Sequence, residues 1–254
     1  MVYRKILIIG TKGISSNIMF NFLENKQYDS SIVIEESISS VTLVKNRIKK
    51  LGLIKVIGQL MFQVGIAPVL KVFSQGRANE IMGNYNLDKV GIASNKIQYV
   101  KTVNSQEMID IILRVAPELI LLSGCRIVSN KTLGKIDIPI VNIHVGITPQ
   151  YRGVHGGYWA IRSKDQQNFG VTLHYVDAGI DTGNVIAQKQ IKFDPKDNFT
   201  TYPILQIAEG LILLKDFIEN NSKVNLDTEN KKSSLWYHPT AWGYLFNKLF
   251  NGVK

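Results

Sequence analysis

The sequence predicts an α/β fold, in which helices flank a central sheet. Short apolar runs that are typical of buried strands alternate along the chain with segments whose apolar residues have helical spacing. The size agrees, because 254 residues, of which 45% are hydrophobic and 20% charged, can fill one sizeable core. In folds of this class ligands bind at the carboxyl ends of the strands, so polar residues at those ends are the first candidates for a site.

The first half of the chain begins with a strand over 5–9, a turn over 10–13, a helix over 14–23 and a strand over 30–34. A long segment over 41–82 follows, and its apolar spacing predicts a helix up to Pro68, which should end or kink it. Beyond it we expect helices over 104–115, 158–163 and 202–217, and strands over 118–123, 138–144, 170–176 and 184–191.

Two parts of this organisation are expected to be additions to the core. We expect a catalytic domain over 1–219 that carries a helical insertion at about 41–82. A C-terminal extension over 220–254 should then pack on the core or form a dimer or nucleotide contact. Within it, 220–232 is polar and predicts a connection, and the aromatic cluster from Trp236 to Phe246 should dock back on the core.

Composition limits the compartment and the partners. The single cysteine, Cys125, excludes an internal disulfide and suits a reducing compartment. The N-terminus has no signal-peptide pattern, so we expect a cytoplasmic protein. The net charge of +10 suggests acidic partners such as nucleotides, nucleic acid, polyglutamylated cofactors or anionic lipid, although a solvated basic surface explains it as well.

The segment from Leu51 to Phe73 is apolar enough to raise the question of a membrane. Lys55, Gln59 and Lys71 would lie within the hydrocarbon of a spanning helix, which argues against a span. A basic amphipathic helix over 41–67 that contacts a membrane surface or a partner stays open, and packing on its own domain is the interpretation that we prefer.

The most informative residues follow the apolar run that ends the strand over 138–144. Asn142 and His144 are two residues apart, so a strand points both side chains to one face at its carboxyl end. Asp181 lies in a Gly-flanked loop where a ligand can approach the backbone closely. An amide, an imidazole and a carboxylate at strand ends are suited to acyl transfer.

Other motifs are weaker. The turn over 10–17 follows a strand and opens a helix, so its amides could hold a phosphate, but a plain turn explains it equally well. No His/Cys cluster has the spacing of a metal site, and Cys125 is expected to be a small apolar residue. Trp242 and Tyr244 could stack a nucleotide base, although such aromatic residues are more often core.

Taken together, these motifs resemble the family of formyltransferases that use N10-formyltetrahydrofolate. The family pattern is roughly Asn-x-His, Pro-x-Tyr-Arg-Gly, Gly-Val-Thr-x-His and Asp-x-Gly-x-Asp-Thr-Gly. The matching segments of this chain are Asn142–His144, Pro149–Gly153, Gly170–His174 and Asp177–Gly183. The resemblance implies a Rossmann-like mixed twisted sheet flanked by helices, the formyltransferase fold, with a short C-terminal extension.

The resemblance also implies roles. It makes Asn142, His144 and Asp181 the catalytic triad. The residues implied to hold N10-formyltetrahydrofolate are Ser123, Gly124, Cys125, Arg126, Ile127 and Val128 on one side, and Asp177, Ala178, Gly179 and Ile180 on the other. For the acceptor we expect contacts from Gly10, Lys12, Tyr151, Arg152, Gly153, His155, Gly156, Trp159 and Trp242.

The acceptor is chosen by elimination within the family. Methionyl-tRNA formyltransferases carry a sizeable C-terminal domain, for which 220–254 is too short, and glycinamide ribonucleotide formyltransferases lack an insertion like 41–82. The His155-Gly-Gly157 loop also departs from the common family pattern. We therefore expect a nucleotide-linked amino deoxysugar used for bacterial surface polysaccharides such as O-antigen lipopolysaccharide, and a homodimer could form through the extension. The two other acceptors, or a non-catalytic folate- or nucleotide-binding protein, are the alternatives.

Overall fold

The computed structural model describes residues 3–221 and 231–253, and a seven-stranded sheet forms its centre. The strand order is β3-β2-β1-β4-β5-β7-β8, and the first five strands in this order are parallel to one another. Strand β7 pairs antiparallel with β5, and β8 pairs antiparallel with β7. The strands are β1 (Lys5–Thr11), β2 (Asp29–Glu35), β3 (Ile97–Val100), β4 (Leu119–Ser123), β5 (Ile140–His144), β7 (Gly170–Tyr175) and β8 (Val185–Gln190). This mixed sheet is the predicted α/β formyltransferase fold.

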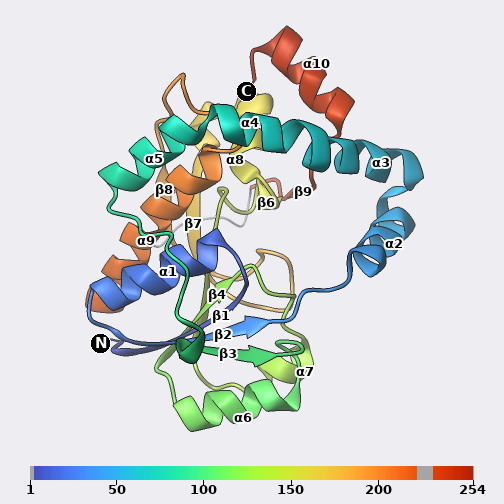
Figure 1. The fold of residues 1–254 in the computed structure, drawn as a ribbon. Coiled ribbons are helices and arrows are strands. Elements are labelled where there is room, and N and C mark those ends of the chain that lie inside the picture. The colour runs from blue at the N-terminus through green and yellow to red at the C-terminus, as the bar shows by residue number, and fades with distance from the viewer. Residues whose placement is uncertain (1–2, 222–230, 254) are drawn as a thin grey trace.

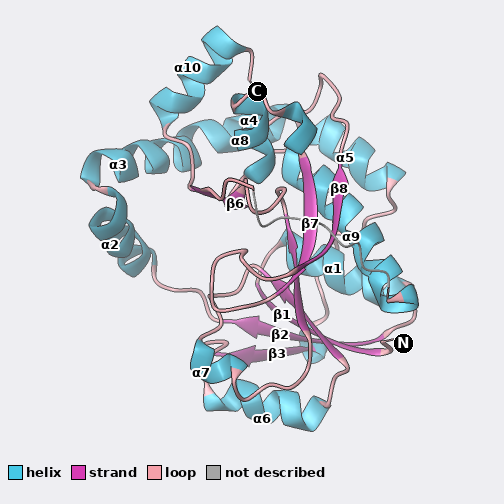
Figure 2. Ribbon diagram, turned by 180° about the vertical axis from the view of Figure 1, so that it is seen from behind, coloured by secondary structure: helices cyan, strands magenta, loops and turns pink. Residues whose placement is uncertain are grey.

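Helices cover both faces of the sheet, as Figures 1 and 2 show from opposite sides. Those near the sheet are α1 (Ile14–Asn25), α6 (Gln106–Val115), α7 (Asn130–Leu133), α8 (Gly156–Arg162) and α9 (Tyr202–Asn220), with 3₁₀ turns η2 (Ser94–Lys96) and η3 (Gln166–Asn168). The alternation of β1 shows why both faces are needed. Ile6 and Ile8 join the larger core cluster beside α1 and α9, whereas Leu7 and Ile9 join the smaller one beside α6.

Between β2 and β3 the chain forms the predicted helical insertion, but its breaks differ from the prediction. It contains α2 (Ser40–Leu51), α3 (Leu53–Met61), the π-helical turn η1 (Phe62–Ile66), α4 (Ala67–Phe73) and α5 (Gln75–Asn84). The expected end of the helix at Pro68 is wrong, because the helical path continues through Pro68 to Phe73. The π-helical turn η1 lies directly before Pro68, and the expected alternative, a kink at this proline, stays a prediction. The helical path breaks instead at Gly52, which has a φ of 83°.

The path from Leu53 to Phe73 is a notable feature of the insertion. By length and composition alone these 21 residues could cross a membrane. Within them, a window of 18 residues has a mean hydropathy of 1.7, and 22% of that window is buried. Figure 1 shows α3 and α4 running across one end of the molecule, away from the sheet.

The C-terminal segment returns to the core by a route that the sequence did not predict. A two-residue strand, β9 (Leu235–Trp236), pairs in parallel with β6 (Arg152–Gly153), and α10 (Ala241–Asn251) then packs against α3. The expectation that the aromatic cluster docks on the core holds for Tyr244, which is 1% exposed, but not for Trp242 and Phe246, which are 47% and 58% exposed. Of the predicted connection over 220–232, residues 222–230 lie outside the described residues. The division into a domain and an extension stays a prediction.

One ion pair holds the insertion on the sheet domain. The Arg77 guanidinium on α5 makes two hydrogen bonds to the Asp197 carboxylate, of 2.8 and 3.2 Å. The Asp197 side chain has no exposed surface. A carboxylate without its partner in that position would be a buried, uncompensated charge.

We therefore predict that Arg77→Ala lowers the free energy of unfolding by about 3 kcal/mol, because it leaves Asp197 buried and unpaired. Differential scanning fluorimetry or urea unfolding measures the loss. Glu80→Gln is the matched control, since Glu80 contacts the same guanidinium at 2.9 Å but is 47% exposed. Equal losses in the two variants would contradict the role given to the buried pair.

Candidate active site

A cleft with two lobes lies at the carboxyl ends of β4 and β5. The lobes have volumes of about 400 and about 340 Å³. Seven residues line both lobes, which therefore meet along Leu122, Gly124, Asn142, Ile143, Val145, Gly153 and Val154. The strand order reverses between β1 and β4, and such a switch point is where open α/β sheets bind ligands.

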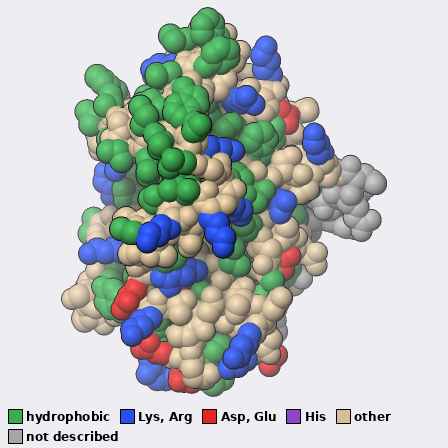
Figure 3. Space-filling model, turned by 90° about the vertical axis from the view of Figure 1, so that its right-hand side faces the viewer, with side chains coloured by type: hydrophobic (Ala, Val, Ile, Leu, Met, Phe, Trp, Pro, Cys, Tyr) green, Lys and Arg blue, Asp and Glu red, His purple; other side chains and the backbone are tan. Residues whose placement is uncertain are grey.

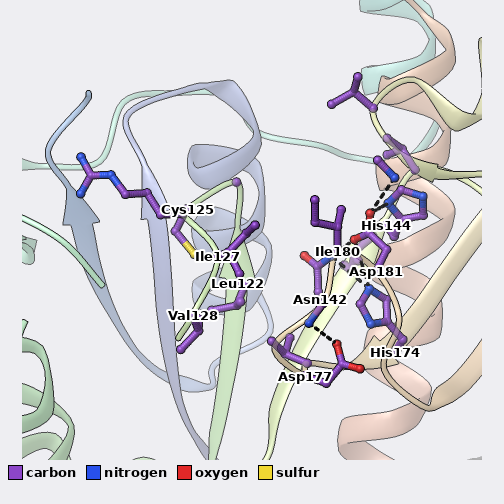
Figure 4. Close-up of a pocket in the computed structure, with 18 residues that line it drawn as sticks. Leu122, Cys125, Ile127, Val128, Asn142, His144, His174, Asp177, Ile180 and Asp181 are labelled. Carbon is purple, nitrogen blue, oxygen red and sulfur yellow. Dashed lines mark hydrogen bonds and ion pairs between the residues drawn. The ribbon is translucent and has the colours of Figure 1, made fainter. Parts of the chain in front are cut away.

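The three residues that the motifs singled out come together in the larger lobe (Figure 4), and Asn142 also lines the smaller lobe. Asn142 and His144 extend from β5, as the period of a strand predicts. Asp181 comes from the loop between β7 and β8 and has a φ of 51°. Its carboxylate lies 3.4 Å from Asn142 Nδ2 and 3.2 Å from His144 Nδ1.

His174, the last residue of the Gly170–His174 motif, is a fourth member of this group. It lies on β7 directly opposite Asn142. Its Nε2 is 3.2 Å from Asn142 Nδ2 and 3.6 Å from Asp181 Oδ1, and its Nδ1 is 2.7 Å from the carbonyl oxygen of Tyr175. The Gly-Val-Thr-x-His motif was the signal that could have placed His174 here.

The electrostatics of the site favour one proton-accepting pair. Burial would raise the pKa of Asp181, but the hydrogen bond to His174, the charge of His144 and the Gly153 N–H together hold that pKa below its ordinary value. Burial lowers the pKa of His144, and Asp181 and the Tyr151 carbonyl oppose this shift. The resting site therefore holds an ionised carboxylate against an uncharged imidazole.

Both nitrogens of His144 face oxygen acceptors. Nε2 is 2.6 Å from the carbonyl oxygen of Tyr151, and Nδ1 is 3.2 Å from Asp181 Oδ2. A proton that arrives at His144 therefore finds an acceptor on either side. The arrangement can take up a proton in a water-poor site without creating an unpaired buried charge.

The Asp181 loop is held in place by the segment that contains β6. The Gly153 N–H donates to Asp181 Oδ2 at 2.9 Å, and Arg152 donates to the carbonyl oxygen of Ile180 at 3.0 Å. Gly153 has a φ of 95°, and a Cβ there would lie 2.3 Å from the carbonyl oxygen of Trp236. The pairing of β6 with β9 therefore requires glycine at 153.

The larger lobe is bounded on one side by the backbone that follows β4. This segment, 124–128, has no regular secondary structure and is anchored from beneath by the buried carboxylate of Glu35. Glu35 accepts from the Arg126 backbone N–H at 2.8 Å, from its guanidinium at 2.9 Å, and from the Val103 N–H at 2.7 Å. The Arg126 side chain is therefore engaged away from the lobe, and the backbone is what a ligand meets.

The smaller lobe is bounded by the first turn of α1 and by two histidines. His155 Nε2 lies 3.0 Å from His238 Nδ1, and His155 has a φ of 59° at the start of α8. Burial lowers the pKa of His155 to about 3, with a smaller contribution from His238. Burial also lowers the pKa of His238 to about 4, helped by Arg47 on α2. The two rings are uncharged at neutral pH.

The structure places most of the predicted contact residues at the cleft. Those that line the larger lobe are Gly124, Cys125, Arg126, Ile127, Val128, Asp177, Gly179 and Ile180. Ser123 and His155 line the smaller lobe, and Gly153 lines both. Trp159 lines a neighbouring cavity, with Lys55 and Tyr237. Ala178 lies in the Asp177–Asp181 loop but lines neither lobe, and Lys12 is exposed in the turn before α1.

Five further predicted acceptor contacts line neither lobe. Gly10 lies beneath the cleft, where a Cβ would collide with Ser16 Oγ at 2.6 Å. Tyr151 is buried, with its hydroxyl on Asp165, and Gly156 packs against Gly146. Trp242 is half-exposed on α10 and lines neither lobe, so the structure does not support its expected stacking on a base. Arg152 acts on the Asp181 loop, as described above.

Comparison with known proteins agrees with this site. Residues 67–204, more than half of the chain, match the model of the Formyl transferase family. The chain belongs to this family. Nothing finer follows from the family match itself.

Individual relatives place it among several members of the family. It is 30% identical over 95 residues to the methionyl-tRNA formyltransferase of Finegoldia magna. The matched residues make up 37% of this chain and 30% of that protein. The chain thus matches about a third of the length of this curated relative. A likely sugar N-formyltransferase from Mycobacterium tuberculosis has a similar structure, with a TM-score of 0.54 and 18% identity over 93% of this chain and 75% of that one. WlaRD, a sugar 3N-formyl transferase solved in the presence of dTDP and 5-N-formyl-THF, also has a similar structure. Its TM-score is 0.51 and its sequence identity 18%, over 92% of this chain and 70% of that one. At such identities the structures share the fold.

The histidine pair predicts acid sensitivity. Both pKa values in the folded state lie below the 6.5 of an ordinary histidine. As the pH falls below about 6.5, the unfolded chain binds protons that the folded chain does not, so stability falls until the pH reaches about 4 for His238 and about 3 for His155. Each imidazole contributes up to about 1.4 kcal/mol per pH unit in this window.

The measurement is the melting temperature from pH 7.5 to 5, for the native chain and for His155→Asn/His238→Asn. We expect a flatter pH dependence in the double variant, whatever its absolute stability. Curves that stay parallel over this range would show that the two rings are not the groups that titrate.

Proposed function

We propose that this formyltransferase moves a formyl group from N10-formyltetrahydrofolate to the primary amine of a nucleotide-linked amino deoxysugar. The observation that carries the proposal is the position of Asn142, which lines both lobes. Asp181 lies 3.4 Å from the Asn142 amide nitrogen and 3.2 Å from His144 Nδ1. A donor in one lobe and an acceptor in the other would meet at these side chains.

The larger lobe fits the flat heterocycle of the donor. Leu122, Ile127, Val128 and Ile180 supply apolar walls, and the backbone from Gly124 onwards supplies N–H and C=O groups for a polar edge. The cavity of about 400 Å³ lies on the side of Asn142 that leads to the Asp177–Asp181 loop. These residues would hold the ring between two loops.

The chemistry of the chain's own residues follows from their positions. When bound, the donor supplies the formyl group. The Asn142 amide can donate a hydrogen bond to the formyl oxygen as negative charge develops on it, a contribution typically worth about 3 kcal/mol. His144 and Asp181 can accept the proton that the attacking amine loses, directly or through one water. His174 and the Gly153 N–H orient the Asp181 carboxylate.

The smaller lobe supports an anionic acceptor. The first turn of α1 borders it with Gly13, Ile14 and Ser15, and the N-terminus of a helix favours phosphate groups. The uncharged pair His155 and His238 can offer hydrogen bonds to hydroxyl groups. The names of the sugar N-formyltransferases with the same fold support a sugar acceptor, and WlaRD was solved with dTDP.

Methionyl-tRNA is the second candidate, and the similarity to the Finegoldia magna enzyme favours it. The net charge of +10 suits either a nucleotide sugar or a tRNA. We also propose that the enzyme is cytoplasmic and that its sugar product is used in the synthesis of bacterial surface polysaccharides.

We predict that Asn142→Ala, His144→Ala and Asp181→Ala each lower kcat by at least about 100-fold, because each removes a group at the reacting atoms. Single-turnover assays with saturating donor measure the loss, and circular dichroism checks the fold. Ser129→Ala is a matched control, since Ser129 follows the segment that lines the larger lobe but its side chain caps α7. A variant that keeps near-native turnover removes its residue from the mechanism.

The acceptor is tested by mass spectrometry with N10-formyltetrahydrofolate as donor. We expect a formyl adduct on a nucleotide-linked 3-amino or 4-amino deoxysugar, and none on methionyl-tRNA or glycinamide ribonucleotide. Formylation of either of the latter would keep the catalytic assignment and overturn the sugar. Binding of folate without product on any acceptor would contradict the acceptor class as a whole.

A further inference from the structure

One side of the insertion exposes a continuous apolar stripe. On α3 and η1 the exposed side chains Ile54, Ile57, Met61 and Val64 recur at intervals of three and four residues, so they share one helical face. Val69, Val72 and Phe73 continue it along α4, where Phe73 is 86% exposed. The π-helical turn adds a residue to the repeat and keeps the later side chains in line with the earlier ones.

The opposite face of this helix packs on the protein. Val56, Gln59 and Phe62 are each 1% exposed. Gln59 Nε2 donates to the carbonyl oxygen of His238 at 2.8 Å, and Phe62 packs against Phe199 and Tyr244. The helix is therefore amphipathic with its apolar stripe turned outward, and it is held flat against the domain.

Helix α10 also packs one side on the domain and exposes apolar side chains on the other. Ala241, Tyr244 and Asn247 are buried, whereas Leu245, Phe246, Leu249 and Phe250 are 46% to 75% exposed. The indole of Trp242 occupies the space above Gly58, where a Cβ would lie 2.3 Å from the ring. This contact joins α10 to α3, so the two apolar stripes form one surface, which we call the apolar face.

Basic residues surround the apolar face, and acidic ones are absent from the sequence around it. Residues 37–79 contain no Asp or Glu, and neither do residues 231–253. Exposed lysines in these segments are Lys45, Lys49, Lys50, Lys55, Lys71, Lys231, Lys232 and Lys248. Figure 3 shows the hydrophobic side chains gathered over this side, with Lys and Arg side chains at their edge.

We infer that the apolar face docks on the surface of a membrane that contains anionic phospholipid, with α3, α4 and α10 lying in its plane. Aromatic and aliphatic side chains enter the boundary between headgroups and acyl chains, and the lysines contact the lipid phosphates. The charge distribution selects this occupant over a second copy of the chain. A two-fold dimer through this face would set the same basic rim against itself, without an acid from residues 37–79 or 231–253 to neutralise it.

Docking in the plane also fits better than crossing. A spanning helix would have to give up the contacts of Gln59 and Phe62 and expose Lys55 and Lys71 to hydrocarbon. In the plane, both lysines can reach water or phosphate while the packed face stays in place.

The inference does not depend on which acceptor the enzyme uses, and its test has a separate readout. Purified full-length protein is floated with vesicles of phosphatidylcholine alone or with about 30% phosphatidylglycerol, at low salt and at about 0.5 M salt. We expect binding to the anionic vesicles that weakens in salt but persists, because apolar insertion is not screened.

Two variants and a matched control identify the surface. Phe246→Gln/Phe250→Gln should lower the vesicle partition coefficient by about tenfold or more, since it removes two inserted aromatic rings. Lys45→Gln/Lys49→Gln should lower it mainly on anionic vesicles. Leu113→Gln, a 70% exposed leucine on α6, should change nothing.

Several outcomes would overturn the inference. The first is absence of binding to anionic vesicles, and the second is equal loss in Leu113→Gln. Resistance to alkaline carbonate extraction would mean that the helix spans. Light scattering that finds a dimer, converted to monomer by Phe246→Gln/Phe250→Gln, would make a second copy the occupant. Turnover of a soluble acceptor, measured alongside, separates each of these from a failure of the proposed chemistry.

Discussion

The Asp181 carboxylate is the point at which the separate parts of this catalytic site are joined. One oxygen accepts the Gly153 N–H and faces His144, and the other faces Asn142 and His174. Its partners come from β5, β6 and β7, and Asp181 itself from the loop before β8. An ionised carboxylate in a buried place is stable only with such donors, so the same contacts that keep its pKa low also hold three chain segments together.

That joint extends to the end of the chain. Gly153 approaches Trp236 closely enough to exclude a Cβ, and Trp236 stacks between Tyr151 and Trp159 at centroid distances of 5.9 and 4.7 Å. Its indole N–H donates to the carbonyl oxygen of Gln150 at 2.9 Å. The C-terminal segment is thus part of the wall behind the catalytic loop. Trp236 therefore packs against the same Gly153 whose N–H donates to Asp181.

The sequence was sufficient for features with a local signal. Six of the seven strands of the sheet, the face shared by Asn142 and His144, and the Asp181 loop follow from periodicity and from glycine positions within a few residues, whereas β3 was not predicted. Features that depend on long-range pairing were not predictable in this way. The two-residue pairing of β6 with β9 and the Glu35 anchor beneath Arg126 join segments that are more than 80 residues apart, and neither has a repeat or spacing that marks it. The helix continues past Pro68 after a π-helical turn, and periodicity alone does not reveal such a turn. In the aromatic cluster Trp236 and Tyr244 pack on the core as expected, whereas Trp242 and Phe246 are exposed, because composition does not show which side of α10 faces outward.

Contacts through the packed side of α3 connect the apolar face to the candidate cleft. Gln59 lies on the packed side of α3 and donates to the His238 backbone, and the His238 ring contacts His155 in the smaller lobe. Arg47 on α2 also acts on His238, because its charge helps to hold that ring uncharged. A helix whose outer face enters a membrane surface would have its inner face fixed against the wall of the acceptor lobe. The helix would then serve two functions, because its spacing places different residues on its two faces. The outer face would hold the enzyme at a membrane surface, and the inner face would shape the smaller lobe, in which the acceptor amine is presented to Asn142.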